Sequence, residues 1–540
     1  MKSIRTFCLL VLASGMALGQ ASQPNNSNVA DDLKTLRDAI AAQQKQIAEQ
    51  QKKLEELQQQ LNAKAAAPAP HVQNATLTTT VPATNVSMVQ ADTEKPKESP
   101  LSLRIGGTEF TPGGFVDFNN IFRTTNTGNA VSTSFNAIPF SNTAQGQLTE
   151  FRSSGQYSRF NLKVSGKYGE NKIGGYIEAD FNGNDAANVF VTTNPHTFRL
   201  RLYYLQLGRG NWEFTLGQAW GLLTPNKVGV GASPSDLDTT IATDGNIMAG
   251  VMYSRDAQFR IAFKPSDHFG WALSVANPQQ IAPAVTFPSG GNLEKIGAQA
   301  EGATNAGAPN LIPDISTKIA FDTNPTGKNI HFEVGGLVTS AQIAVPRPGV
   351  PGAFDKESAI GGGGFGGVGV SLTKKFRVVA HGMYGNGDGR YFIGSGPMFV
   401  VVPIAIAPTV FTAEPSMVHA GSGFAGAEWL ATSSTQIGAY YGGIYYGRNA
   451  FTDITSTAPV QPIIGYGGIG SGTNNNRTIQ QGELVIAHTM WKNPQYGAFV
   501  VASDSSYVTR APWFVATTPT PQPKNAHMFM TKIDFKYVLP

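Results

Sequence analysis

One stretch of the sequence decides the fold class, and it reads Arg159, Phe160, Asn161, Leu162, Lys163, Val164, Ser165. Apolar and polar residues alternate along it without a break. Because successive side chains of a β-strand point to opposite faces, this stretch predicts a strand with one oily face and one charged face. The same alternation recurs in other short segments, at 172–181, 198–202, 259–264, 375–378 and 529–539.

Strand candidates of this kind fill the chain from about residue 104 onward. Seventeen segments qualify: 113–125, 157–168, 172–183, 197–208, 211–218, 248–255, 257–264, 269–277, 315–322, 330–340, 361–373, 375–386, 417–431, 433–447, 479–492, 495–509 and 527–539. Bacterial single-chain barrels have even numbers of strands, so we expect sixteen strands and one wrong segment. A soluble antiparallel sandwich also alternates, but the pattern here continues for about 400 residues without a helix.

The composition favours a membrane protein. Charged residues make up 14% of the chain, whereas about 25% is usual in soluble proteins. Pro403 and Pro408 interrupt the most apolar run, at 399–413, so that run does not predict a spanning helix. A membrane protein without such helices has to be a closed barrel. We therefore expect an all-β transmembrane barrel of about 16 antiparallel strands around an aqueous channel. The formal net charge of +4 implies no nucleic-acid partner.

The N-terminus carries the pattern of a secretory signal. In residues 1–19, Lys2 and Arg5 precede an apolar run that is too short to span a bilayer as a helix. A short membrane anchor is the alternative interpretation. Cys8 is the only cysteine and lies in this segment, so the mature chain would contain no disulfide.

Three further segments precede the expected barrel at 104–540. Residues 20–30 form a polar spacer, and the linker at 65–103, rich in Pro, Ala and Thr, is expected to be extended. Between them, residues 31–64 show a heptad seam that predicts a coiled coil. The seam residues are Leu33, Leu36, Ile40, Ile47, Leu54, Leu57 and Leu61. We expect a trimer, although the seam alone does not determine how many helices associate. A single helix packed on the barrel is the alternative.

The charged faces of the strands are the main candidate functional feature. Cations that project into a low-dielectric lumen raise the local concentration of anions and set charge selectivity. The expected basic lumen residues are Arg159, Lys163, Arg199, Arg201, Arg260 and Arg377. Glu178 and Asp180 form the expected acidic lumen face, and opposed basic and acidic ladders would create a transverse field. The simpler alternative is that these charges only keep the lumen wet.

Long segments rich in Gly, Asn, Thr and Pro alternate with tight turns, as expected for outer-membrane barrels. The segment at 219–247 is the candidate for a loop that folds inward and narrows the lumen, and it contains Lys227, Asp236, Asp238 and Asp244. A plain external loop is the alternative. The spacing of its aspartates fits no standard calcium loop.

Motifs for enzymatic chemistry are missing from the sequence. It contains no H-E-x-x-H, no G-x-S-x-G and no phosphate-binding Gly-Lys loop, and its eight histidines form no ligand-spaced pair. We therefore expect no catalytic residue, no metal and no cofactor.

One region carries a family resemblance. The residues Phe198, Arg199, Leu200, Arg201, Leu202, Tyr203 and Tyr204 are followed by Leu216, Gly217, Gln218, Ala219 and Trp220. This pattern resembles the DcaP-like porins of Gram-negative outer membranes, which have an R-x-R strand, a short turn and a returning strand that ends in G-Q-x-W. The motif covers only residues 198–220, while the layout of signal, coiled coil, linker and barrel matches over the whole mature chain.

The resemblance implies a sixteen-stranded homotrimer in the outer membrane, with its coiled coil in the periplasm. It also implies a basic constriction that favours small anionic solutes such as dicarboxylates. One feature departs from the family, because these barrels usually end on an aromatic residue and this chain ends on Leu539 and Pro540.

The sequence thus predicts an outer-membrane porin for passive diffusion of small hydrophilic, anionic solutes, with membrane lipid and further copies of the chain as partners. The alternative is a scaffold protein that links the barrel to the cell wall through the coiled coil without transport. A barrel enzyme or a transporter for hydrophobic solutes is a third interpretation, and the charged strand faces argue against it.

Overall fold

In this computed structural model, the described residues are Lys45 and residues 99–540, apart from 130, 184–196, 246, 279–287, 289–292, 294–309, 394–395 and 516–520. Lys45 is helical. The expected signal at 1–19, the spacer and the seam residues at 33–61 lie outside the described residues. Within the part of the chain that the structure describes, no helix is long and apolar enough to cross a membrane.

Sixteen antiparallel strands form a closed barrel, which confirms the expected antiparallel barrel and its strand number. Each strand pairs with the next one along the wall, and β2 pairs with β22 to close it, with Phe118 opposite Phe535. The wall consists of β2 (Thr108–Arg123), β4 (Arg159–Tyr168), β5 (Asn171–Asp180), β6 (Arg199–Arg209), β7 (Trp212–Trp220), β8 (Arg255–Ser266), β9 (Phe269–Ala276), β10 (Asp314–Asp322), β11 (Ile330–Pro346), β12 (Phe354–Ser371), β13 (Phe376–Asn386), β16 (His419–Leu430), β17 (Thr435–Tyr446), β20 (Asn476–Asn493), β21 (Gly497–Pro512) and β22 (Ala526–Val538).

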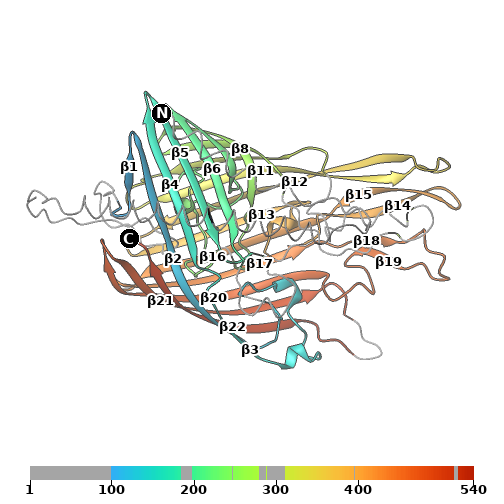
Figure 1. Ribbon diagram of the computed structural model, residues 1–540. Coiled ribbons are helices and arrows are strands. Elements are labelled where there is room, and N and C mark those ends of the chain that lie inside the picture. The colour runs from blue at the N-terminus through green and yellow to red at the C-terminus, as the bar shows by residue number, and fades with distance from the viewer. Residues whose placement is uncertain are drawn as a thin grey trace, which may run out of the picture. The chain divides into compact units, whose positions relative to one another are not determined.

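The remaining strands are short additions to this wall or hairpins within its loops. They are β1 (Leu103–Ile105), β3 (Glu150–Ser154), β14 (Phe399–Ala407), β15 (Val410–Met417), β18 (Asn449–Thr452) and β19 (Ile463–Tyr466). Strands β11 and β12 are longer than the wall requires, and Figure 1 shows them projecting beyond one end of the barrel together with β14 and β15. Apolar side chains of β11, β14 and β15, including Ile343, Val401 and Phe411, pack together in this projection.

The two ends of the barrel differ in their connections. At one end, tight turns join strands such as β4 to β5 and β6 to β7, with Gly169 and Gly210 at positive φ as such turns require. At the other end lie the long loops, among them 124–149 and 221–254. In outer-membrane barrels the tight turns face the periplasm and the long loops face the outside.

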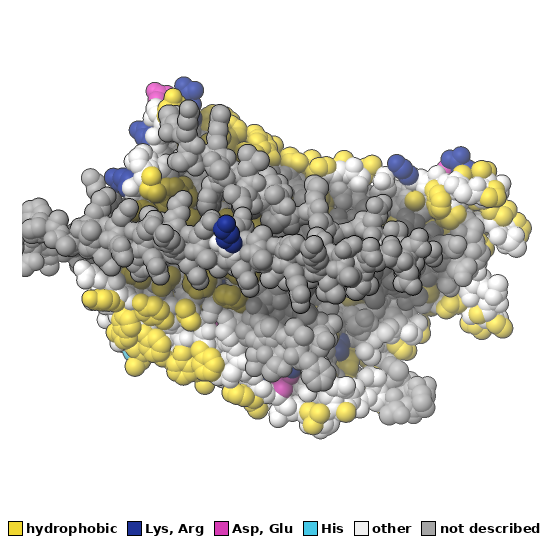
Figure 2. All heavy atoms as spheres, viewed as in Figure 1, with side chains coloured by type: hydrophobic (Ala, Val, Ile, Leu, Met, Phe, Trp, Pro, Cys, Tyr) yellow, Lys and Arg dark blue, Asp and Glu magenta, His cyan; other side chains and the backbone are white. Residues whose placement is uncertain are grey.

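The outer face of the wall is apolar. Large hydrophobic side chains on the outward positions are 40–50% exposed, such as Phe160, Leu200 and Phe535. Figure 2 shows hydrophobic side chains gathered over a broad area at the lower left of the barrel. Exposed apolar surface of this extent indicates contact with a membrane or with another protein.

The structure corrects one of the seventeen expected strands. Residues 248–255 contribute only Arg255 to a wall strand, and the rest belongs to the loop between β7 and β8. Met248 and Val251 are fully buried there. The run is apolar because it packs inside the barrel, and apolar content alone does not distinguish such a loop from a strand.

Candidate functional site: the charged lumen

A ladder of ion pairs covers the inner face of β4, β5 and β6. The Arg201 guanidinium lies 2.8 Å from both Glu178 and Asp180. Arg199 lies 2.7 Å from Asp180, and Arg159 lies 3.7 Å from Glu178. Five residues that the sequence predicted for the lumen thus lie together. The two carboxylates neutralise the neighbouring arginines, and do not form a separate wall opposite them.

A bulge in β6 determines which of its side chains face inward in this ladder. The register between β5 and β6 shifts at Glu178 and Ala179, so Arg201 is the extra residue on β6. Leu202 therefore also points inward and is 0% exposed. The alternation at 198–202 predicts one apolar face shared by Phe198, Leu200 and Leu202, and this is wrong for Leu202, because strict alternation holds only where the strand pairing has no bulge.

Three cations of this half of the lumen lack a carboxylate partner. Among the described residues, no carboxylate lies within 4 Å of Arg255, Arg260 or Lys163. Arg260 is buried and donates to the backbone oxygen of Trp220 and to Gln258. The half-buried guanidinium of Arg255 lies 5.4 Å from the Trp220 ring and interacts electrostatically with Arg201, Tyr253, Arg199 and Asp244. Sequence reasoning missed Arg255, because it stands at the end of the segment mistaken for a strand.

The loop at 221–254 lies inside the barrel, where Ala232 and Leu237 pack against Leu202 and Tyr204 of β6. Its first part contacts β10 and β11, where the Gly229 amide donates to Asp322 at 2.8 Å and the Asn226 amide donates to Glu333 at 3.2 Å. Lys318 lies 3.0 Å from the same Glu333 carboxylate. These wall side chains are almost fully buried beneath the loop.

Asp238 fixes the centre of the loop. Its carboxylate accepts hydrogen bonds from both terminal nitrogens of the Arg377 guanidinium on β13, and Nη1 lies at 2.8 Å. The same carboxylate lies 3.0 Å from Nε2 of His381. Burial disfavours the charged carboxylate, but Arg377 and His381 outweigh it, so the pKa of Asp238 lies below its usual range. Arg377, which the sequence predicted as a selectivity residue, therefore holds the loop in place.

The later part of the loop follows the wall around to β22. The Ile241 amide donates to the Tyr440 hydroxyl at 3.1 Å, and the Thr243 hydroxyl donates to Asp534. The Ala249 amide donates to Gln481 at 2.9 Å, and Ser422 donates to the Gly250 oxygen at 2.9 Å. The loop thus contacts strands from β10 to β22.

Glycines in the wall make this close approach feasible. A Cβ atom on Gly442 of β17 would overlap the Ala249 oxygen, and a Cβ atom on Gly250 would overlap the Gly423 oxygen of β16. Gly250 also has a φ of 101°. The backbone of the loop therefore lies directly against the backbone of the wall.

The other charged residues of the loop have different surroundings. Lys227 and Asp236 are half-buried, and the Lys227 amide donates to the Asp236 oxygen in a small hairpin. Asp244 lies near the far end of the loop and is 5% exposed. It interacts electrostatically with Arg159 and Arg201 of the ladder and with Asp117 on β2.

Further carboxylates are spread along the inner wall, and the pairing places Glu483 level with Met530 and Asp117 level with Lys536. They come from four adjacent strands, and comprise Asp117 on β2, Glu483 on β20, Asp504 on β21 and Asp534 on β22. Only two lysines of the described chain pair with them, Lys532 with Asp504 at 3.2 Å and Lys536 with Asp117 at 3.8 Å. Alternation along β22 predicts which of its residues face inward. It does not predict that Glu483 and Asp504 lie on the strands next to it, because a single-strand pattern carries no information on how strands pair.

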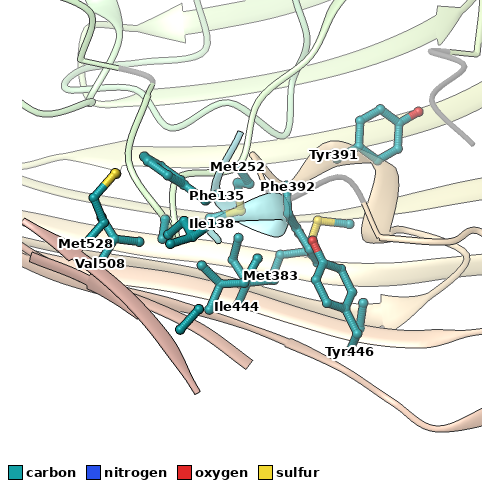
Figure 3. Close-up of a cluster of buried hydrophobic side chains, with 14 of the residues drawn as sticks. Phe135, Ile138, Met252, Met383, Tyr391, Phe392, Ile444, Tyr446, Val508 and Met528 are labelled. Carbon is teal, nitrogen blue, oxygen red and sulfur yellow. The ribbon is translucent and has the colours of Figure 1, made fainter. Parts of the chain in front are cut away.

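Towards the long loops, the inside of the barrel is apolar. Phe135 and Ile138 from the loop at 124–149 meet Met252 and Phe392 from two other loops, and inward side chains of the wall complete the cluster. Figure 3 shows these side chains converging from opposite directions. The inner face is thus polar and charged only over part of its height, which alternation along single strands did not reveal.

Solved structures of similar architecture come from outer membranes. The outer membrane channel DcaP of Acinetobacter baumannii matches with a TM-score of 0.52 and 16% identity, over 80% of this chain and 98% of that one. OmpT of Vibrio cholerae has a TM-score of 0.41 and 8% identity over 81% and 99% of the two chains. OprB of Pseudomonas putida has a TM-score of 0.40 and 10% identity over 79% and 94%.

The sixteen-stranded barrel with an inserted loop is the fold of outer-membrane porins. The likeness to the DcaP channel shows this fold for the barrel of the present chain. No protein-family model matches the chain, and no curated protein matches it.

Proposed function

We propose that this protein is an outer-membrane channel for passive diffusion of small hydrophilic solutes that carry a carboxylate, such as dicarboxylates. One observation carries the proposal. The loop at 221–254 lines the interior of the barrel, with hydrogen bonds to strands from β10 to β22 and apolar contacts to Leu202 and Tyr204 of β6, and the charged ladder of β4 to β6 faces the same interior. A solute that crosses the barrel passes between these two surfaces.

The preference for anions rests on Arg255, Arg260 and Lys163. The charges of Arg199 and Arg201 are offset by Glu178 and Asp180, whereas these three cations have no carboxylate within 4 Å among the described residues. Unpaired cations in a low-dielectric wall attract anions.

The remaining parts of the proposal follow the layout of the sequence. The barrel sits in the outer membrane with its apolar face towards lipid, and three copies associate. The coiled coil at 31–64 lies in the periplasm and strengthens the trimer, and it is free to contact the cell wall. The channel carries out no chemistry and needs no metal or cofactor.

A pair of variants tests the anion preference. Arg255→Gln together with Arg260→Gln should shift the reversal potential in a salt gradient towards cation selectivity, because both substitutions remove charge without leaving an unpaired carboxylate. Arg209→Gln is the matched control, since Arg209 is exposed at a tight turn outside the lumen. An unchanged reversal potential in the double variant would count against the proposal.

A further inference from the structure

A buried histidine lies beneath the first part of the inserted loop. His331 stands on the inner face of β11, next to the turn that joins β10 to β11, and is 1% exposed. Its Nδ1 atom lies 2.9 Å from the Asp322 carboxylate on β10. Its Nε2 atom lies 3.2 Å from the Glu333 carboxylate on β11. Both ring nitrogens therefore face carboxylate oxygens.

This arrangement suits the doubly protonated ring of His331. A neutral imidazole has one N–H donor and one nitrogen with a lone pair, whereas an imidazolium donates from both nitrogens. In a neutral ring, one nitrogen would present its lone pair to a buried carboxylate, and the two groups would repel each other. His331 therefore makes both contacts only in its charged form.

The same two carboxylates hold the inserted loop. Asp322 accepts a hydrogen bond from the Gly229 amide at 2.8 Å, through the oxygen that does not face His331. Glu333 accepts from the Asn226 amide at 3.2 Å, through the same oxygen that faces His331. A carboxylate that turns away from a neutral His331 would therefore also weaken its contact with the loop.

Few other charges balance these two carboxylates. Lys318 on β10 lies 3.0 Å from Glu333, and His381 on β13 approaches the same carboxylate at 3.7 Å. In the part of the chain that the structure describes, no other cation lies within 4 Å of Glu333 or Asp322, apart from His331 itself. Lys318 and a charged His331 balance the two carboxylates, whereas a neutral His331 would leave one buried negative charge without compensation.

Neutral or exposed groups complete the surroundings of His331. Strand β12 places Gly369 opposite it. In the turn before β11, Asn329 donates to Asp322 at 2.6 Å. His268, in the turn before β9, is exposed and lies 2.7 Å from the backbone oxygen of Asp322. Because histidine is the side chain whose charge ordinarily changes near neutral pH, the charge beneath the loop can vary with pH through His331.

We propose that His331 positions the inserted loop, and that loss of its proton loosens the first part of the loop as the pH rises. This proposal rests on the proposed channel function and adds a means of regulating the same constriction. At lower pH the charged ring fixes both carboxylates, and these hold the loop amides of Asn226 and Gly229. At higher pH one carboxylate loses its donor, so the loop leaves the wall more often.

Single-channel currents of the full-length protein between about pH 6 and about pH 10 test the proposal. We expect a larger and more variable conductance level, whose occupancy rises about tenfold or more over this range because a hydrogen bond to a charged group is lost. An occupancy that does not change with pH would overturn the proposal. If no channel conducts at any pH, the proposed function itself fails, and that result is distinct.

Two substitutions of His331 separate its charge from its shape. His331→Gln is uncharged throughout, so the behaviour expected at high pH should already appear at about pH 6. His331→Lys keeps a cation, so the behaviour at about pH 6 should persist to about pH 9. His527→Gln, exposed on the outer face of β22, is the matched control and should respond to pH as the natural protein does.

Heat-modifiable migration on gels reports whether each variant forms a barrel. The pH response of the natural protein remains a test if neither variant of His331 folds. A response that survives in folded His331→Gln would overturn the proposal. A response removed by His381→Gln and retained in His331→Gln would assign it to the wrong histidine and overturn it equally.

Discussion

Asp238 joins the centre of the inserted loop to the wall through two partners. Its carboxylate is fully buried and joins Arg377 and His381 of β13. Removing one partner of a buried ion pair costs about 3–5 kcal/mol, since the other charge is left without compensation. This ion pair acts together with the hydrogen bonds of the loop to β10, β11, β17, β20 and β22, and we expect it to contribute strongly to the position of the loop.

Asp238→Asn should release the loop, because the amide cannot balance the charge of the buried Arg377. We expect single-channel currents with larger and more variable conductance. Asp236→Asn is the control, since Asp236 is a half-buried carboxylate of the same loop that bonds only locally to Ser235. A steady current of normal size in Asp238→Asn would show that other contacts hold the loop.

Acidification tests the same contact. Because the pKa of Asp238 is lowered in the folded protein, its contribution is present above the ordinary aspartate pKa and is lost only when the pH falls through the lowered value. The loop should therefore stay anchored as the pH falls past about 4. Current recordings at falling pH check this, and a conductance change already near that value would contradict it.

Gly442 offers a test of the close contact between the loop backbone and strand β17. Gly442→Ala places a methyl group against the Ala249 oxygen and should push the loop into the lumen, so conductance should fall. Gly443→Ala is the matched control on the outer face of the same strand, where a Cβ atom meets only ordinary contacts. Equal conductance in the two variants would argue against the observed packing of the loop.

At the scale of elements, the loops at 124–149 and 221–254 are held together by an apolar cluster inside the barrel. Phe135 is fully buried in that cluster. Phe135→Ala should leave a cavity and lower the stability of this packing by about 3–5 kcal/mol. We expect the loop at 124–149 to detach, with faster proteolysis of the loop and an unchanged barrel on gels. Resistance to protease equal to that of the natural protein would show that the cluster does not order the loop.

The elements also show where sequence reasoning succeeds and where it fails. Sixteen of the expected strands exist, because each has one exposed apolar face and one face towards polar or packed surroundings. The segment at 248–255 failed because a buried loop and a strand can be equally apolar. The projection formed by β11, β12, β14 and β15 was missed, since its residues pack on one another and do not follow the pattern of the membrane wall.

The site was predictable only in part. The alternation of β4, β5 and β6 places Arg159, Glu178 and Arg201 inside, and the structure brings them together. Their mutual pairing depends on strand register and on the bulge at Arg201, which single strands do not reveal. The inward carboxylates of β2, β20, β21 and β22 lie on four strands, so no local pattern relates them to one another.

At the scale of the whole molecule, the barrel described from residue 99 onward closes by its own strand pairing. Deletion of residues 20–98 with the signal retained should therefore leave a heat-modifiable barrel that conducts. If the coiled coil strengthens a trimer, as we propose, the variant should dissociate to monomers at a lower temperature. Loss of conductance with an intact barrel would contradict the independence of the barrel, and a protein that never conducts would favour the scaffold alternative.

The decisive measurement for the proposed channel is the current through single molecules of the purified full-length protein in a planar bilayer under a salt gradient. We predict stable, water-filled channels whose reversal potential shows preference for anions over cations. The absence of stable channels, or a clear preference for cations, would contradict the proposal.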